Sequence, residues 1–297
     1  MKSGIVAVVG RANAGKSTLI NVMVGEKVAI VSPKPQTTRE RILGVLNGDD
    51  YQIVFEDTPG IYKAESLLNA RMQRSTELSV RDVDLILYVI DAHDGLKEED
   101  VNTLKKYAIG RLPLILALSK TDIMPKENIP DLVKSFDGIP NINKIVSLSA
   151  RRGKNVKKLL EEILKLLPDG EPIYDENVVS NRSERFMIAE IMREKMLLKY
   201  DKEIPHGVAV IINTFEKQQN GVYDINLDIV CEKKNHKAII IGKQGQALKE
   251  VSSFAREGME KFLGAKVFLT VYVKVKEDWR NDPTRLKEYG YDESDLY

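Results

Sequence analysis

The residues whose types and spacing carry the clearest chemistry are Gly10-Arg11-Ala12-Asn13-Ala14-Gly15-Lys16-Ser17, followed by Thr18. This segment fits the pattern G-x-x-x-x-G-K-S/T and lies between an apolar run and an amphipathic stretch, where we expect a strand and a helix. There the glycines let backbone amides surround phosphate oxygens, Lys16 reaches the terminal phosphates and Ser17 offers its hydroxyl to Mg²⁺. The segment predicts a nucleoside triphosphate site; an ordinary glycine-rich turn is the alternative.

Three later segments bear on which nucleotide binds. Asp57-Thr58-Pro59-Gly60 follows an apolar run and would place a carboxylate near the metal and a glycine amide near the γ-phosphate. Ser119-Lys120-Thr121-Asp122 ends another run, and Asp122 can accept hydrogen bonds from the ring N–H and the exocyclic amine of guanine, which adenine does not offer. The stem of Lys120 can lie against the base, and Ser149-Ala150 can present a backbone amide to the guanine carbonyl. Guanine is therefore the predicted base.

In this order the motifs resemble those of the translation-factor-like branch of P-loop GTPases, over residues 1–170. The resemblance implies that Ser32–Arg41 is the first switch loop and that its Thr38 joins Ser17 at Mg²⁺. It also implies that Asp57 holds Mg²⁺ through a water. The residues implied in catalysis are Lys16, Thr38 and Gly60. A loop that orders on the γ-phosphate and releases after hydrolysis would make the protein a switch.

The base motif departs from the family at its first position. The family pattern is usually N-K-x-D, and Ser119 replaces the asparagine. That asparagine braces the phosphate-binding loop and reaches the purine N7, which a shorter hydroxyl does only in part. We expect guanine preference to be retained through Asp122, with weaker affinity.

The residue after Gly60 also differs from the one that Ras-like GTPases have there. Ras-like GTPases have a glutamine there that orients the attacking water, whereas this chain has Ile61, which has no polar side-chain atom. Relatives with a hydrophobic residue at this position and an asparagine in the loop use K⁺ as an added positive charge. The resemblance thus implies K⁺ at Asn13, with backbone carbonyls of Ser32 and Lys34 completing its shell. Slow intrinsic hydrolysis is the parallel expectation.

The motifs are positioned by expected strands and helices that alternate along the chain. Through about residue 167, short apolar runs alternate with helical patterns, which predicts an α/β fold with a mainly parallel sheet and helices on both faces. The expected strands are 5–9, 52–55, 85–90, 114–118 and 144–148. The expected helices are 16–24, 67–79, 98–108 and 156–167.

The second half has a different order, helix–strand–strand–helix–helix–strand, which predicts a smaller α+β domain. Its expected elements are 183–199, 207–215, 223–230, 238–241, 246–263 and 266–275. A G-x-x-G pattern precedes its long helix and resembles that of a type II K-homology (KH) domain, whose glycines let the backbone approach about four nucleotides of single-stranded RNA. The expected RNA-binding residues are Ile241, Gly242, Lys243, Gln244, Gly245 and Lys249. A helix–turn–helix used only for packing is the alternative.

A GTPase domain followed directly by a type II KH domain resembles the Era family of bacterial ribosome-assembly GTPases, over nearly the whole chain. The expected division is a G domain at 1–170, a linker at 171–182, the KH domain at 183–277 and a tail at 278–297. The resemblance implies binding of GTP and GDP, of 16S rRNA near its 3′ end and of the 30S subunit, and loose attachment to the inner face of the cell membrane. We also expect a monomer. Two other readings stay open: a KH protein whose G domain senses GTP or GDP with little turnover, and a P-loop ATPase.

Charge is unevenly distributed along the chain. The sequence has 45 Lys and Arg against 44 Asp and Glu, a net charge of +1. Between residues 233 and 276, however, nine lysines and one arginine stand against three glutamates, which favours an RNA-facing surface there. The single Cys231 excludes an intrachain disulfide, and the apolar runs are far shorter than the ~20 residues that cross a bilayer. We therefore expect a cytoplasmic protein.

Overall fold

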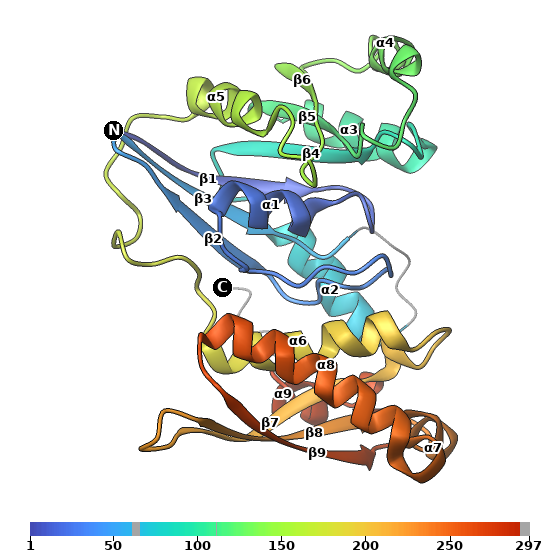
Figure 1. Cartoon of the computed structure of the whole chain (residues 1–297). Coiled ribbons are helices and arrows are strands. Elements are labelled where there is room, and N and C mark those ends of the chain that lie inside the picture. Colours follow the sequence, from blue (N-terminus) through green and yellow to red (C-terminus); the bar gives the residue numbers. More distant parts are fainter. Residues whose placement is uncertain (61–65, 111, 292–297) are drawn as a thin grey trace. The chain divides into compact units, whose positions relative to one another are not determined.

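The computed structural model describes residues 1–60, 66–110 and 112–291, which fall into two compact units (Figure 1). The first unit takes its described residues from 1–29, 38–63 and 72–181, and the second from 30–37, 64–71 and 182–297. The described segments 30–37 and 66–71 thus group with the second unit. In the described ranges, the helices are too short or too polar to cross a membrane.

The first unit is built on a six-stranded sheet with the order β2-β3-β1-β4-β5-β6. Its strands are β1 (Lys2–Val9), β2 (Ile42–Asn47), β3 (Tyr51–Asp57), β4 (Leu85–Asp91), β5 (Leu114–Ser119) and β6 (Lys144–Ser147). β2 runs antiparallel to β3, and the other neighbours are parallel, which confirms the predicted mainly parallel sheet. Parallel strands end at the same edge, so the segments after β1, β3, β5 and β6 all start there.

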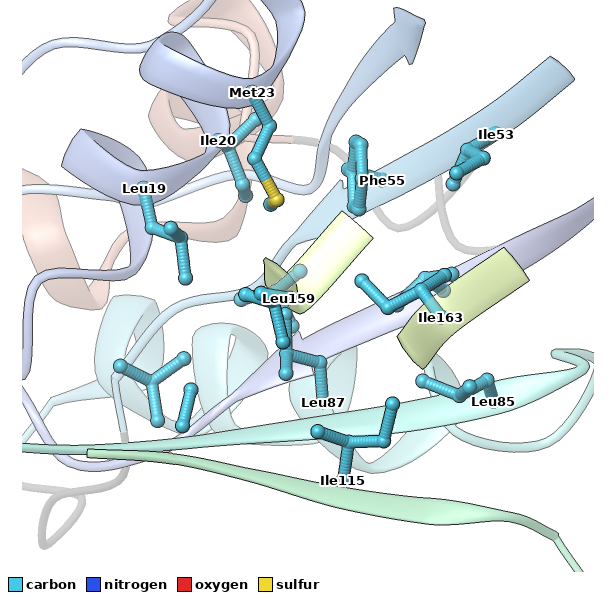
Figure 2. Close-up of a cluster of buried hydrophobic side chains, with 14 of the residues drawn as sticks. Leu19, Ile20, Met23, Ile53, Phe55, Leu85, Leu87, Ile115, Leu159 and Ile163 are labelled. Atoms are coloured by element: carbon cyan, nitrogen blue, oxygen red, sulfur yellow. The ribbon is translucent and has the colours of Figure 1, made fainter. Parts of the chain in front are cut away.

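Helices cover both faces of this sheet, as the alternation of elements predicts. On one face, α1 (Lys16–Val24) and α5 (Val156–Leu166) bury their apolar side chains against the strands, as Figure 2 shows for Leu19, Leu159 and Leu87. On the other face, α3 (Glu98–Ala108) packs through Leu104 against Tyr88. The remaining helices with residues in this unit are α2 (Leu67–Leu78), η1 (Lys126–Asn128) and α4 (Ile129–Lys134).

Strand β2 was not predicted from the sequence. It contains Gly44, and glycine inside a strand weakens the strand signal because it adds no side chain to pack. In the fold a Cβ at this position would lie only 3.0 Å from Cγ2 of Val24 and 3.1 Å from Cγ2 of Ile20. The glycine therefore allows the strand to pass close to α1.

The segment predicted as a linker, 171–182, follows the edge of the sheet at β2. The backbone N–H of Val45 donates to the carbonyl of Val179 at 2.8 Å, and that of Leu43 donates to Oδ1 of Asn181 at 3.0 Å. These bonds use N–H groups that an edge strand would otherwise expose to other chains. The connector is thus ordered against the first unit.

The second unit has a three-stranded sheet in which β8 runs antiparallel to β7 and parallel to β9. Its elements are α6 (Glu184–Lys199), η2 (Pro205–Gly207), β7 (Ala209–Lys217), β8 (Tyr223–Cys231), α7 (Lys234–Ile241), η3 (Lys243–Gly245), α8 (Gln246–Leu263), β9 (Val267–Val275), η4 (Trp279–Asn281) and α9 (Pro283–Glu288). A core cluster combines side chains of the helices, such as Met192 and Ala255, with side chains of the sheet, such as Leu227. The predicted order of elements is confirmed, with the apolar run 238–241 forming the end of α7.

The polar tail after β9 packs on the second unit as far as residue 291. Trp279 is fully buried, and its indole N–H donates to the carbonyl of Gly207 at 3.0 Å. The rings of Tyr289 and Tyr291 lie 5.5 and 5.9 Å from the indole ring, between centroids. The tail therefore adds an aromatic cluster to the core.

Within the second unit, helix α6 holds segment 30–37 through one buried arginine. The guanidinium of Arg193 donates to the backbone carbonyls of Gln36, at 3.3 Å, and Thr37. Glu190, one turn earlier on α6, accepts two hydrogen bonds from the same guanidinium and balances its charge. A buried charge is tolerated when it is paired and hydrogen-bonded, so this arrangement stabilises the segment against α6.

Truncation of a buried side chain between α5 and the sheet should destabilise the first unit. Ile163 is fully buried, so Ile163→Ala should lower the free energy of unfolding by about 2–5 kcal/mol, through lost burial and the cavity left behind. Ile109→Ala is the matched control, because Ile109 is 86% exposed, and it should change stability by less than about 0.5 kcal/mol. Urea denaturation followed by circular dichroism measures both. Equal losses for the two variants would contradict the packing described.

Candidate functional site

The phosphate-binding loop, Gly10–Gly15, connects β1 to α1 at the edge where the parallel strands end. Gly10 has φ +145°, and a Cβ there would lie 2.3 Å from the carbonyl oxygen of Val89 in β4. Gly15 has φ +96° and caps the N-terminus of α1, while Asn13 has φ 63°. Gly10 thus allows a close approach that a side chain would block, and Gly15 adopts a φ that L side chains rarely adopt. The N-terminal amides of α1 point at the loop. Thr18 follows in the first turn of α1.

Lys16 lies across this loop. Its ammonium is buried and donates to the carbonyls of Gly10 and Arg11, both at 3.0 Å. Burial lowers the pKa of Lys16 to about 8, and the neighbouring charge of Asp57 acts in the opposite direction. The loop therefore holds a positive charge at the position where the terminal phosphates of a nucleotide would bind.

Three polar side chains meet beside the loop. Oγ of Ser17 donates to Oδ2 of Asp57 at 2.6 Å, Oγ1 of Thr38 donates to the same oxygen at 3.1 Å, and the two hydroxyls are 3.0 Å apart. Burial raises the pKa of Asp57, while Lys16 and the two hydroxyls counteract it. Oδ1 of Asp57 is buried and has no hydrogen-bond partner among residues 1–60, 66–110 and 112–291. Hydroxyls and a carboxylate with a spare oxygen are ligands that suit Mg²⁺, so the three residues predicted to hold this ion fit it.

The segment after Asp57 lies against the phosphate-binding loop. Oγ1 of Thr58 donates to the carbonyl of Val8 at 3.0 Å, and the carbonyl of Pro59 accepts from Thr76 in α2. A Cβ at Gly60 would lie 2.7 Å from Cα of Ala12, so a residue with a side chain would push the two segments apart. Ile61, predicted to follow in the site, lies outside the described residues.

The predicted base-binding residues meet at the ends of β5 and β6. Oγ of Ser119 donates to the carbonyl of Ala14 at 2.5 Å and to that of Ile90 at 3.0 Å, so it connects β5 to the phosphate-binding loop. Nζ of Lys120 lies 2.6 Å from Oδ2 of Asp91, and Lys120 has φ 56°.

Asp122 lies near the segment after β6. A hydrogen bond with Ser149 is the main cause that lowers the pKa of Asp122, whose carboxyl is largely exposed. The carboxylate is therefore ionised at neutral pH and accessible to donors. Thr121 is fixed by its backbone N–H, which donates to Leu148 at 3.2 Å, and Ala150 follows Ser149 in a turn closed by Gly153.

The predicted RNA-binding turn joins α7 to α8 in the second unit. Gly242 has φ 72° and ψ −178°, and Gly245 has φ 79°, both conformations that favour glycine. A Cβ at Gly242 would lie 2.6 Å from Cβ of Ala247. Between the glycines, Lys243 and Gln244 are exposed, as is Lys249 in α8. The turn thus presents bare backbone next to positive charge, which suits close approach of a sugar–phosphate chain.

Sequence reasoning missed how Arg11 is anchored. Its Nε donates to Oδ2 of Asp100 in α3 at 2.9 Å, and its Nη2 donates to the carbonyl of Gly95 at 3.1 Å. Asp100 is buried and also accepts from the Tyr88 hydroxyl and the Lys97 backbone, both at 3.0 Å. The signal that indicates Asp100 is its place three residues after the helix cap, where an acidic side chain reaches back to the cap backbone.

Comparison with family models matches two parts of the chain. Residues 5–120 match a family described as 50S ribosome-binding GTPase, and residues 203–280 match the KH domain. The first match contains the phosphate-binding loop and ends at Lys120. The second contains the Gly242–Gly245 turn.

Whole proteins and solved structures match over nearly the full length. GTPase Era of Clostridium kluyveri is 44% identical over 98% of this chain and 99% of its own, and GTPase Era of Clostridium novyi has the same identity and coverage. A variant of Aquifex aeolicus Era bound to GDP·AlF4⁻ matches with a TM-score of 0.93. Era in complex with MgGDPNP and nucleotides 1506–1542 of 16S ribosomal RNA matches with a TM-score of 0.94. Both structures are 39% identical to this chain and cover 98% of it and 99% of their own chains.

The lowered pKa of Lys16 predicts that nucleotide affinity declines with rising pH. Because the ammonium loses its proton as pH rises through about 8, the apparent Kd for GDP should increase above that pH, by at most about tenfold per pH unit. Isothermal titration between pH 7 and 9 measures it. Lys16→Arg is the control, since a guanidinium stays charged over this range. An equal dependence in both proteins would assign the effect to another group.

Proposed function

Because this chain belongs to the GTPase Era family and is a GTP hydrolase, we propose that it is a GTP-driven switch that binds 16S ribosomal RNA near its 3′ end and acts in assembly of the small (30S) ribosomal subunit. One observation carries the proposal: the same chain contains the Ser17–Thr38–Asp57 cluster and the Gly242–Gly245 turn. The first suits a nucleotide-bound metal and the second suits RNA.

The sequence motifs would bind the nucleotide and its Mg²⁺. The proposed binding residues are Gly10, Arg11, Ala12, Asn13, Ala14, Gly15, Lys16, Ser17, Thr18, Asp57, Thr58, Pro59, Gly60, Ile61, Ser119, Lys120, Thr121, Asp122, Ser149 and Ala150. Ser17 and Thr38 would hold Mg²⁺ directly and Asp57 through a water, supported by the free Oδ1 of that buried carboxylate. A bound Mg²⁺ supplies positive charge to the phosphate oxygens.

In hydrolysis, water attacks the γ-phosphate, and GDP and phosphate leave. The Lys16 ammonium stabilises negative charge that develops on the terminal phosphates. Gly60 contributes its backbone amide, and its contact with Ala12 keeps that amide beside the phosphate-binding loop. The hydroxyl of Thr38 would bind Mg²⁺ together with that of Ser17. Without a glutamine after Gly60, the chain lacks a side chain that orients the water there, so slow hydrolysis is expected.

We propose that K⁺ supplies the missing charge and that Asn13 binds it. Hydrolysis should then be several-fold faster in KCl than in NaCl, and Asn13→Gly should abolish the difference, because it removes the amide oxygen while glycine adopts φ 63° without cost. Asn141→Gly is the matched control, with φ 59° and no place in the site. Equal rates of phosphate release in the two salts would contradict the proposal.

The proposed RNA-binding residues are Ile241, Gly242, Lys243, Gln244, Gly245 and Lys249. Gly242→Asp should weaken binding of a 16S rRNA 3′-end oligonucleotide by roughly tenfold or more, since it fills the turn and repels phosphate. Hydrolysis of GTP without RNA should stay unchanged. Filter binding and phosphate release measure the two.

Two charge-matched variants test RNA binding even if Gly242→Asp misfolds. Lys243→Glu and Lys261→Glu make the same change at exposed positions near the two ends of α8, one within the turn. Only Lys243→Glu should reduce RNA binding strongly.

In cells, crosslinking with GTP or GDP present should enrich a discrete small-subunit rRNA site for the wild type. Absence of rRNA enrichment would refute the proposed function.

Three further expectations stay predictions: the domain bounds, a monomeric state, and cytoplasmic location with peripheral attachment to the inner face of the membrane. Limited proteolysis with mass measurement of the fragments tests the bounds. Native mass measurement tests the monomer, and flotation with anionic vesicles tests the membrane attachment.

A further inference from the structure

Position 119 holds a serine whose hydroxyl hydrogen is already used inside the protein. Ser119 ends β5 and is only 2% exposed. Its Oγ lies 2.5 Å from the carbonyl oxygen of Ala14 and 3.0 Å from that of Ile90. A carbonyl oxygen only accepts, and a serine hydroxyl has one hydrogen, so that hydrogen is directed at these two backbone atoms.

A bound nucleotide meets only the acceptor side of this hydroxyl. N7 of guanine has a lone pair and no hydrogen, so it needs a donor. Two acceptor atoms form no hydrogen bond with each other. The Ser119 side chain therefore provides no hydrogen bond to N7.

We propose that this GTPase does not recognise N7 of guanine, and that base selection rests on the ring N–H and exocyclic amine that Asp122 accepts. The inference rests on the proposed function, since it takes Asp122 and the Gly10–Ser17 segment as the nucleotide site. It makes Ser119 a positioning residue, which joins β5 to a carbonyl 105 residues away in the phosphate-binding loop.

The neighbouring donors of the base motif also have protein partners. Nζ of Lys120 is anchored 2.6 Å from Oδ2 of Asp91. The backbone N–H of Thr121 donates to the carbonyl of Leu148, and the Thr121 side chain is buried. These contacts give the Lys120 ammonium and the Thr121 backbone N–H partners within the protein.

An asparagine at position 119 would differ in its number of donors. Its amide nitrogen carries two hydrogens, so one can bond to the Ala14 carbonyl while the other stays available to N7. A Cβ at Gly15 would lie 3.6 Å from Oγ of Ser119, so this position lies against the end of the phosphate-binding loop. Ser119→Asn should therefore create N7 recognition in this chain.

Binding of three nucleotides to the full chain tests the proposal. In 7-deaza-GDP a C–H replaces N7, and IDP lacks the exocyclic amine. The wild type should bind GDP and 7-deaza-GDP with Kd values within about twofold, and should bind IDP at least about tenfold more weakly. Ser119→Asn should prefer GDP over 7-deaza-GDP by about fivefold, the net value of one neutral hydrogen bond.

A wild-type preference for GDP over 7-deaza-GDP of about fivefold or more would overturn the inference, because N7 would then have a donor. Equal wild-type binding of IDP and GDP would instead refute the proposed role of Asp122, so the two failures are distinguishable. Ser119→Ala serves if Ser119→Asn does not fold. It removes the hydrogen bond to the Ala14 carbonyl and no contact with the base. It should therefore weaken binding of GDP and 7-deaza-GDP by the same factor. Unequal losses would contradict the inference.

Discussion

The carboxylate of Asp57 is the group on which the nucleotide site depends. It is fully buried, and a buried carboxylate is costly unless hydrogen bonds or a cation compensate for lost hydration. One of its oxygens accepts from Ser17 at the start of α1 and from Thr38 in the segment between α1 and β2. Three segments distant in sequence therefore meet at one carboxylate, and among the described residues its second oxygen has no hydrogen-bond partner.

The sequence predicted most of the fold because the central strands are buried on both faces. Such strands must be continuous apolar runs, and Leu85–Asp91 and Leu114–Ser119 are buried throughout their length. β2 was missed because its Gly44 is set by the approach of α1, a tertiary contact that leaves no local pattern. The packing of the tail has no local sequence pattern for the same reason, since the hydrogen-bond partner of Trp279 lies 72 residues away.

The candidate site was predictable where its chemistry is contiguous. The phosphate-binding loop and the Gly242–Gly245 turn need particular backbone conformations, and these require particular residue types at fixed spacing. Residues that position the loop from a distance carry no such pattern. Asp100 lies 89 residues from Arg11, and the outcome at Ser119 depended on which carbonyls surround its hydroxyl. Contact geometry, absent from a sequence, decides these cases.

Thr37 and Thr38 are consecutive residues whose hydrogen bonds lead in different directions. The carbonyl of Thr37 accepts from Arg193 of α6, and the hydroxyl of Thr38 donates to Asp57. A trans peptide bond fixes their Cα atoms about 3.8 Å apart. The guanidinium of Arg193 also donates to Gln36 and Glu190, so Thr37 is one of several acceptors that it uses. One peptide bond thus separates a residue hydrogen-bonded to Asp57 from a residue hydrogen-bonded to α6, and the division between the two units falls at that bond.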